Sequence, residues 1–110
     1  MPVPAAVKVE ALTADFGSQR RVADVLGVSP AQVSRWRRGQ GIDPQNAERL
    51  DLLELAMSSL IRLYEPETAE RWLNGRNPHL RGRRPIELIR LGETRELLAV
   101  LRQERAGSYA

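Results

Sequence analysis

The sequence predicts an all-α protein in which an N-terminal helix-turn-helix is joined, through one long shared helix, to a small C-terminal helical domain. Three observations support this fold class. Apolar residues recur at helical spacing, whereas the strict alternation and paired turns of β-hairpins are missing. Residues 19–38 carry the pattern of a helix-turn-helix, and residues 44–64 that of a long apolar helix. We therefore expect two domains, residues 1–64 and residues 65–110.

Composition limits the kind of protein. A chain of 110 residues suffices for one domain or two very small ones that share a core. Hydrophobic residues make up 42% and charged residues 28%, which is typical of a globular chain, and the absence of cysteine excludes disulfides and thiolate metal sites. No run of 18 apolar residues and no signal-peptide pattern occurs, so we expect a cytoplasmic protein.

The positive charge comes almost entirely from arginine, with Lys8 as the single lysine. Arginine binds phosphate and carboxylate groups in a fixed fork, so this bias suits nucleic acids and acidic protein surfaces alike. A genome of high GC content would also enrich arginine. The bias alone therefore decides little about function.

The first predicted helix covers residues 5–16. Val9, Leu12 and Phe16 lie on one face of it, and Gly17 follows as its stop.

Residues 19–38 then form the predicted helix-turn-helix. Ala23 is small where two helices must cross, and Gly27 stands at the turn, where a positive φ is easy for glycine. Ser29 can cap the second helix, and Gln32 three residues later completes a capping box. Five apolar residues occupy the positions expected to be buried: Val22, Leu26, Val28, Val33 and Trp36.

This pattern favours DNA binding, because the second helix of such a motif enters the major groove. An ordinary corner between two helices is the alternative, but the cap, the five apolar positions and the basic end together favour DNA binding over it. The expected DNA-binding residues are Gln19, Gln32, Ser34, Arg35, Arg37 and Arg38.

Two roles are expected among these residues. Gln32, Ser34 and Arg35 lie where base edges would be read, since glutamine pairs with adenine and arginine with guanine. The others are expected at phosphates, which position a protein without specifying sequence. Gln32 has a capping role as its alternative, and the two terminal arginines, Arg37 and Arg38, have that of a solvated helix end.

After a break at residues 39–41, Asp43 caps a long helix over residues 44–64 with Pro44 at its first position. Its apolar residues form two stripes: the first is Leu50, Leu53, Met57, Leu60 and Tyr64, and the second is Leu52, Leu55, Ala56 and Leu63. Two stripes predict burial from two sides. One side should face the helix-turn-helix, and the other the C-terminal segment or a second subunit. A central core helix in a monomer is the alternative.

Three shorter helices are expected beyond residue 65. Pro66 begins the first, which ends at Asn74-Gly75. A loop over residues 76–84 with four arginines follows, then a helix from Pro85 to a stop at Gly92, and a last helix over residues 93–105. This segment is too small to bury much core alone, so it should dock on the long helix or on a partner.

The C-terminal segment also carries a specific run, namely Trp72-Leu73, Asn77-Pro78, Leu80, residues 82–89 (GRRPIELI) and Gly92. This run resembles the toxin-binding domain of the Xre/MbcA/ParS antitoxins. In that family an Xre-like helix-turn-helix precedes the domain, which is the order found here. The resemblance covers residues 18–107.

The resemblance implies an antitoxin of a bacterial type II toxin–antitoxin system. Its usual partner is a RES-domain toxin that consumes NAD⁺, and the antitoxin dimerises, covers the toxin and often represses its own operon. In family members the C-terminal domain contacts the toxin, and the chain end can reach into its active-site cleft. On this basis the expected toxin-binding residues are Trp72, Arg81, Arg84, Arg102, Arg105, Ser108, Tyr109 and Ala110.

For two of these residues a role inside the chain is the alternative. Trp72 is first of all a core candidate, and Arg84 needs a fixed partner that is either internal or on the toxin.

No catalytic, metal-binding or cofactor-binding pattern is visible, and His79, the single histidine, is expected on a surface loop. We therefore expect no enzyme, metal or cofactor. Two other functions stay open: a plain dimeric helix-turn-helix repressor, and a localisation or scaffold adaptor without a toxin.

Overall fold

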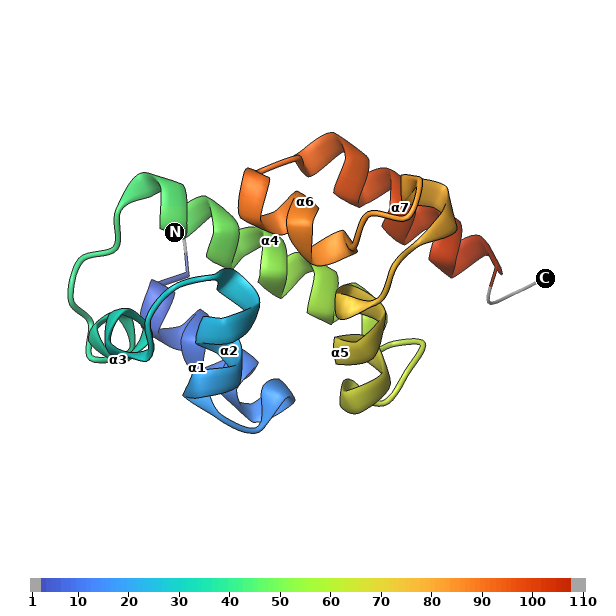
Figure 1. Cartoon of the computed structure of the whole chain (residues 1–110). Helices are drawn as coiled ribbons and strands as arrows, with labels where there is room; N and C mark the ends of the chain where they lie inside the picture. Colours follow the sequence, from blue (N-terminus) through green and yellow to red (C-terminus); the bar gives the residue numbers. More distant parts are fainter. Residues whose placement is uncertain (1–2, 108–110) are drawn as a thin grey trace.

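The structure is a computed structural model that describes residues 3–107, and within that range every regular element is a helix. This confirms the all-α fold class. Figure 1 shows the elements in order: α1 Ala5–Phe16, α2 Gln19–Leu26, α3 Pro30–Arg37, α4 Pro44–Leu60, α5 Pro66–Asn74, the short 3₁₀ helix η1 Pro78–Leu80, α6 Pro85–Leu91 and α7 Thr94–Gly107. No helix in the described range is long and apolar enough to cross a membrane.

Local signals set most of these bounds. Gly17 ends α1 with a φ of 89°, and its N–H donates to the Thr13 carbonyl. Gly27 ends α2 in the same left-handed conformation, with a φ of 74°. The Asp43 side chain accepts a hydrogen bond from the backbone N–H of Asn46 and so caps α4. These stops and caps are confirmed at the predicted residues.

The long helix is shorter than predicted. It ends at Leu60, whose carbonyl accepts hydrogen bonds from the N–H groups of Leu63 and Tyr64, both at 2.9 Å. Pro66 follows at the first position of α5, and the residue before it, Glu65, is extended. Because a proline disfavours helical conformation in the residue before it, the chain has to leave the helix before Pro66.

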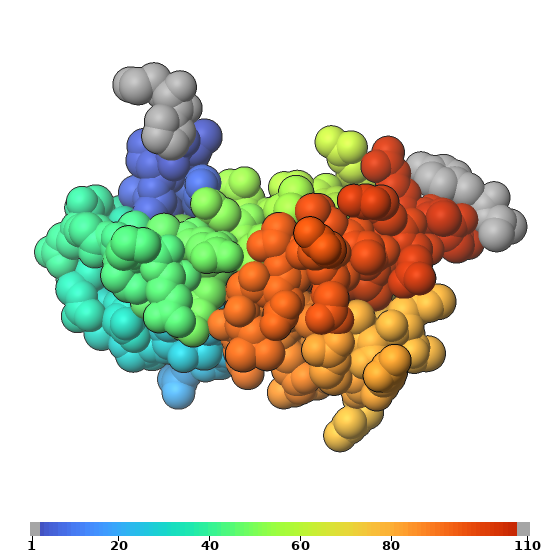
Figure 2. Space-filling view, turned by 90° about the horizontal axis from the view of Figure 1, so that it is seen from above, coloured from blue at the N-terminus to red at the C-terminus, as the bar shows by residue number. Residues whose placement is uncertain are grey.

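Helix α4 runs through the middle of the molecule (Figure 1). Helices α1 and α2 pack on one side of it, and α5, α6 and α7 also pack against it. Figure 2 shows the first turns of α4 side by side with α6 on one continuous surface. The prediction that this helix is covered from two sides is therefore confirmed.

Two residues of the second stripe depart from that prediction. Leu52 and Ala56 are buried, but Leu55 is 41% exposed. Leu63 lies beyond the end of α4 and is only partly buried. Leu55 is exposed because of its position in the helix: it follows Asp51 by four residues and precedes Ser58 by three, and both of these are exposed. Leu55 therefore belongs to the solvent-facing strip of α4, and its expected burial is wrong for this chain.

The buried side chains form one core. It runs from Val9 of α1 through Leu53 of α4 to Leu101 of α7. The two predicted halves thus share a single core across α4, and the division at residue 64 stays a prediction.

Candidate nucleic-acid and protein interfaces

The second helix of the helix-turn-helix, α3, begins with a complete capping box. Ser29 Oγ accepts the Gln32 backbone N–H at 3.2 Å, and Gln32 Oε1 accepts the Ser29 backbone N–H at 3.0 Å. The capping role of Gln32 is confirmed. A bidentate contact to adenine would need the same Oε1 atom as an acceptor, so the two roles compete.

Arg35 is the expected base-reading residue that has the most freedom. Its side chain is exposed on α3, and no hydrogen bond or ion pair joins that side chain to another of residues 3–107. Ser34, by contrast, accepts a hydrogen bond from Arg38 Nη1 at 3.1 Å. Arg35 can therefore offer its whole guanidinium fork to a partner.

Arg37 and Gln19, both expected at phosphates, contact each other. Arg37 Nη1 donates to Gln19 Oε1 at 3.1 Å, and Arg37 Nε forms an ion pair with Glu10 of α1. The pair is about half exposed, so it contributes little to stability by itself. It does join α1, α2 and α3, so a phosphate contact by Arg37 would have to compete with Glu10.

The Asn77-Pro78 motif closes the loop that follows α5. Asn77 is buried, and its N–H donates to the Arg83 carbonyl at 3.0 Å. Its own carbonyl accepts the N–H groups of Leu80 and Gly82, both at 3.0 Å, and its Oδ1 accepts that of His79 at 2.9 Å. This residue thus holds the loop that presents the arginines. His79 is exposed, as predicted.

Within that loop, Arg81 adopts a left-handed conformation with a φ of 58°, and it is the one non-glycine residue of the described range with a positive φ. It is exposed. Arg84 has an internal partner, because its Nε lies 3.3 Å from Glu87 Oε1.

The remaining predicted interface residues lie on α5 and α7. Trp72 is partly buried and packs against the core. Arg102 and Arg105 are exposed on α7. Ser108, Tyr109 and Ala110 lie outside the described residues.

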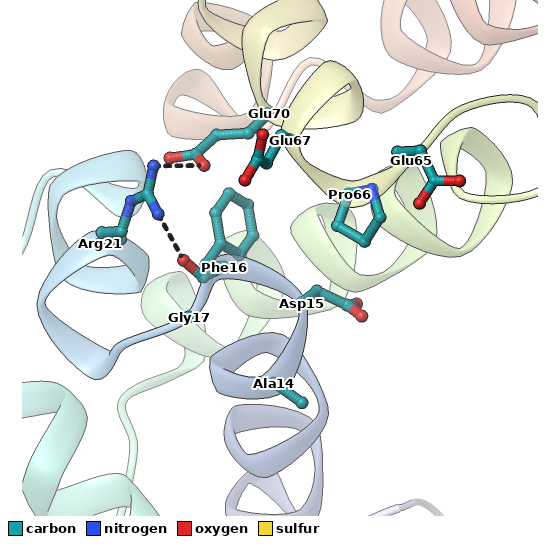
Figure 3. Close-up of a pocket in the computed structure, with 9 residues that line it drawn as sticks. All are labelled: Ala14, Asp15, Phe16, Gly17, Arg21, Glu65, Pro66, Glu67 and Glu70. Atoms are coloured by element: carbon teal, nitrogen blue, oxygen red, sulfur yellow. Dashed lines mark hydrogen bonds and ion pairs between the residues drawn. The ribbon is translucent and has the colours of Figure 1, made fainter.

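A hollow of about 500 Å³ lies between the end of α1 and the start of α5. Figure 3 shows the residues that line it. Arg21 bridges its two sides: Nη1 donates to the Phe16 carbonyl at 3.1 Å, and Nη2 lies 3.0 Å from Glu70 Oε1. Asp15 also lines the hollow, and burial raises the pKa of its carboxyl. Sequence reasoning missed this joint, because nothing in the local pattern of Arg21 points to α5.

A second joint was also missed. Arg90 of α6 donates to two carbonyls at the end of α2, from Nε to Val25 at 3.0 Å and from Nη2 to Asp24 at 2.8 Å. Arg49 of α4 in turn donates from Nε to the Arg90 carbonyl at 2.8 Å. Both arginines donate to carbonyls at helix ends, where partners within the helix are missing; the Asp24 carbonyl also accepts the N–H of Gly27 at 3.3 Å.

Comparison with known proteins gives two family matches. Residues 17–53 match a helix-turn-helix model, and residues 59–107 match the Antitoxin Xre/MbcA/ParS C-terminal toxin-binding domain.

Individual relatives agree with these matches. The mycobacterial cidal antitoxin MbcA of Mycobacterium tuberculosis is 34% identical over 82 residues, which cover 73% of this chain and 72% of the relative. A second relative from that species, named a probable mycobacterial cidal antitoxin, is 34% identical over 87 residues, covering 79% and 75%. A chain in the crystal structure of the M. tuberculosis MbcT–MbcA toxin–antitoxin complex superposes with a TM-score of 0.75 at 30% identity, covering 93% of this chain and 94% of that one.

Proposed function

The chain belongs to the Xre/MbcA/ParS antitoxin family and is an antitoxin of a toxin–antitoxin system, and from this premise we propose that its C-terminal segment occludes a RES-type, NAD-consuming toxin while α3 binds operator DNA. One observation carries the proposal. The helix-turn-helix is followed by the toxin-binding domain, and the fold matches a chain of the MbcT–MbcA complex over 93% of this chain. The RES type of the toxin rests on the family resemblance alone.

Inhibition in this proposal is steric, and this chain performs no chemistry. Arg81, Arg102 and Arg105 support it, because they are exposed and no described contact engages their guanidinium groups. Trp72 is a large aromatic residue that is only partly buried against the core, which suits an interface anchor. Arg84 is a weaker candidate, since Glu87 already engages it.

The experiment expresses the adjacent open reading frame with and without this chain. We expect the neighbouring gene alone to stop growth, the pair to grow, and the tagged toxin to co-purify with this chain in a fixed ratio. A harmless neighbour would contradict the antitoxin role and favour the adaptor. Promoter repression without a co-purifying partner would favour the plain repressor.

Charge reversal tests the toxin-facing residues. The double variant Arg102→Glu, Arg105→Glu should abolish co-purification, because it places like charge against a surface expected to bind cations. Arg20→Glu is a control for charge reversal elsewhere, since Arg20 is also exposed but lies on α2 in the other half of the chain. Equal loss in both variants would point to a general charge effect and not to an interface on α7.

The chain end is part of the same proposal. Removing residues 107–110 should leave the complex intact, because the C-terminal helices remain, but should weaken inhibition if the tail enters the toxin's cleft. Full inhibition by the shortened chain would show that the helical surface alone blocks access.

The DNA half of the proposal assigns base reading to Arg35 and phosphate contact to Arg38, in a homodimer that binds two half-sites. Arg35→Ala should cost about 1–3 kcal/mol on the operator and relax specificity at one position. Arg38→Ala should weaken binding to all sequences and reduce the salt dependence. A mobility-shift assay on the native promoter measures both, and unchanged affinity in the two variants would refute operator binding through α3.

A further inference from the structure

Arg90 belongs to the segment that matches the toxin-binding domain, yet its side chain ends in the helix-turn-helix. Its two donated hydrogen bonds reach carbonyls 65 and 66 residues earlier in the chain. Those carbonyls, of Asp24 and Val25, stand in the last turn of α2, where backbone oxygens lack partners within the helix. A cation at this end also interacts favourably with the helix dipole.

The Arg90 guanidinium lies close to the turn that leads into α3. Gly27 ends α2, and a Cβ placed there would lie only 3.3 Å from Arg90 Nε. Ser29, the N-cap of α3, follows two residues later. Only a few residues therefore connect the carbonyls that Arg90 contacts with the first turn of α3, the helix that carries Arg35.

Arg90 is itself held in place from α4. Arg49 Nε donates to the Arg90 carbonyl at 2.8 Å, and Arg49 Nη1 donates to Asn46 Oδ1 at 3.2 Å. Asn46 in turn donates to the Asp43 cap at 2.8 Å. The guanidinium that contacts α2 therefore extends from a backbone that is anchored at the start of the central helix.

We propose that Arg90 is a positioning residue for DNA recognition, supplied by the toxin-binding segment, and that it sets the orientation of α2, the turn and α3 for selective operator binding. The inference rests on the proposed DNA-binding function. It means that the helix-turn-helix depends on the C-terminal segment for its reading geometry. Arg90 acts through α2 and does not touch DNA.

The test compares full-length R90Q, R90K and R83Q. Arg83 is the matched control, because its Nε also donates to a backbone carbonyl, that of Leu80 at 3.3 Å, and it pairs with Glu96, all within the C-terminal segment. Fluorescence anisotropy measures affinity for operator DNA and for a scrambled duplex, at one salt concentration and far below the melting temperature. Toxin co-purification is measured on the same preparations.

R90Q removes the charge that strengthens both donated hydrogen bonds. We expect its operator affinity to fall about tenfold, while its affinity for the scrambled duplex stays within about twofold. Toxin co-purification should be unchanged. R90K should show intermediate selectivity, because an ammonium group can donate to these carbonyls without matching the fork. R83Q should bind both duplexes as the wild type does.

Several results would overturn the inference. One is wild-type selectivity in R90Q, and another is an equal loss of selectivity in R83Q, which would indicate general destabilisation. A parallel loss on both duplexes would mean that Arg90 touches phosphate directly. If R90Q does not fold, wild-type selectivity in a folded R90K would show that Arg90 serves stability alone. A wild-type chain that does not prefer the operator would instead refute the proposed function itself.

Discussion

Leu→Ala substitutions at two positions of the same helix isolate the effect of burial on the free energy of unfolding. Leu53 and Leu55 lie two residues apart in α4, so Leu→Ala changes helix propensity equally in both cases. Leu53 is 0% exposed and Leu55 is 41% exposed. Truncating a fully buried leucine costs about 2–5 kcal/mol, from lost transfer energy and from the cavity left behind.

These values give a specific expectation. Leu53→Ala should lower the free energy of unfolding by about 3 kcal/mol. Leu55→Ala opens no closed cavity and removes only partly buried surface, so it should cost about 1 kcal/mol or less. At roughly 4 °C per kcal/mol for a chain of this size, the two melting temperatures should differ by about 8 °C.

Urea unfolding and thermal unfolding, both followed by circular dichroism at 222 nm, measure the two variants at low protein concentration. Equal losses would refute the reasoning, because Leu55 would then be as buried in solution as Leu53. Repeating the measurement at a tenfold higher concentration separates the causes. A Leu55→Ala cost that grows with concentration would show that a second copy covers this face of α4 in the expected homodimer.

Three further predictions concern caps and turns. The hydrogen bond from the Asn46 side chain, and then that from its backbone, lowers the pKa of Asp43, so its stabilisation is present at neutral pH and is lost as the pH falls through the folded-state pKa. Asp43→Ala should therefore destabilise the chain at pH 7 but hardly in strong acid, and Asp43→Asn, which keeps a cap, is the control in urea titrations. Arg81→Gly removes the strain of a left-handed conformation in a non-glycine residue, which costs about 1 kcal/mol. The variant should therefore have a higher melting temperature but weaker toxin co-purification. Weaker binding without a gain in stability would contradict this. Gly27→Ala should cost more stability than Gly39→Ala, since both have positive φ but only the first added methyl group meets a neighbouring guanidinium, and equal costs in thermal melts would show that this contact relaxes freely.

Much of the candidate DNA-binding site was accessible from the sequence, because its signals are local. The capping box of Ser29 and Gln32 spans three residues, and the stop at Gly27 needs only a residue that tolerates a positive φ. The assignment of single residues to DNA and to toxin stays a prediction. The structure adds that Gln32 and Arg37 are already engaged, which leaves Arg35 as the freest donor of α3.

The sequence by itself determined the fold class, the starts and stops of nearly all helices and, through its C-terminal motif, the family. These properties depend on contacts within one or two helical turns or on a short motif, so they can be read from neighbouring residues. Only the tertiary structure decided that Leu55 is exposed, because periodicity shows which residues share a face and not what covers that face. It also decided the partners of the arginines: Arg37 meets Glu10 from 27 residues away, and Arg90 reaches α2 from more than 60. Groups that are far apart in the chain come into contact only after the helices have packed. A local sequence pattern therefore could not assign the partners of these arginines.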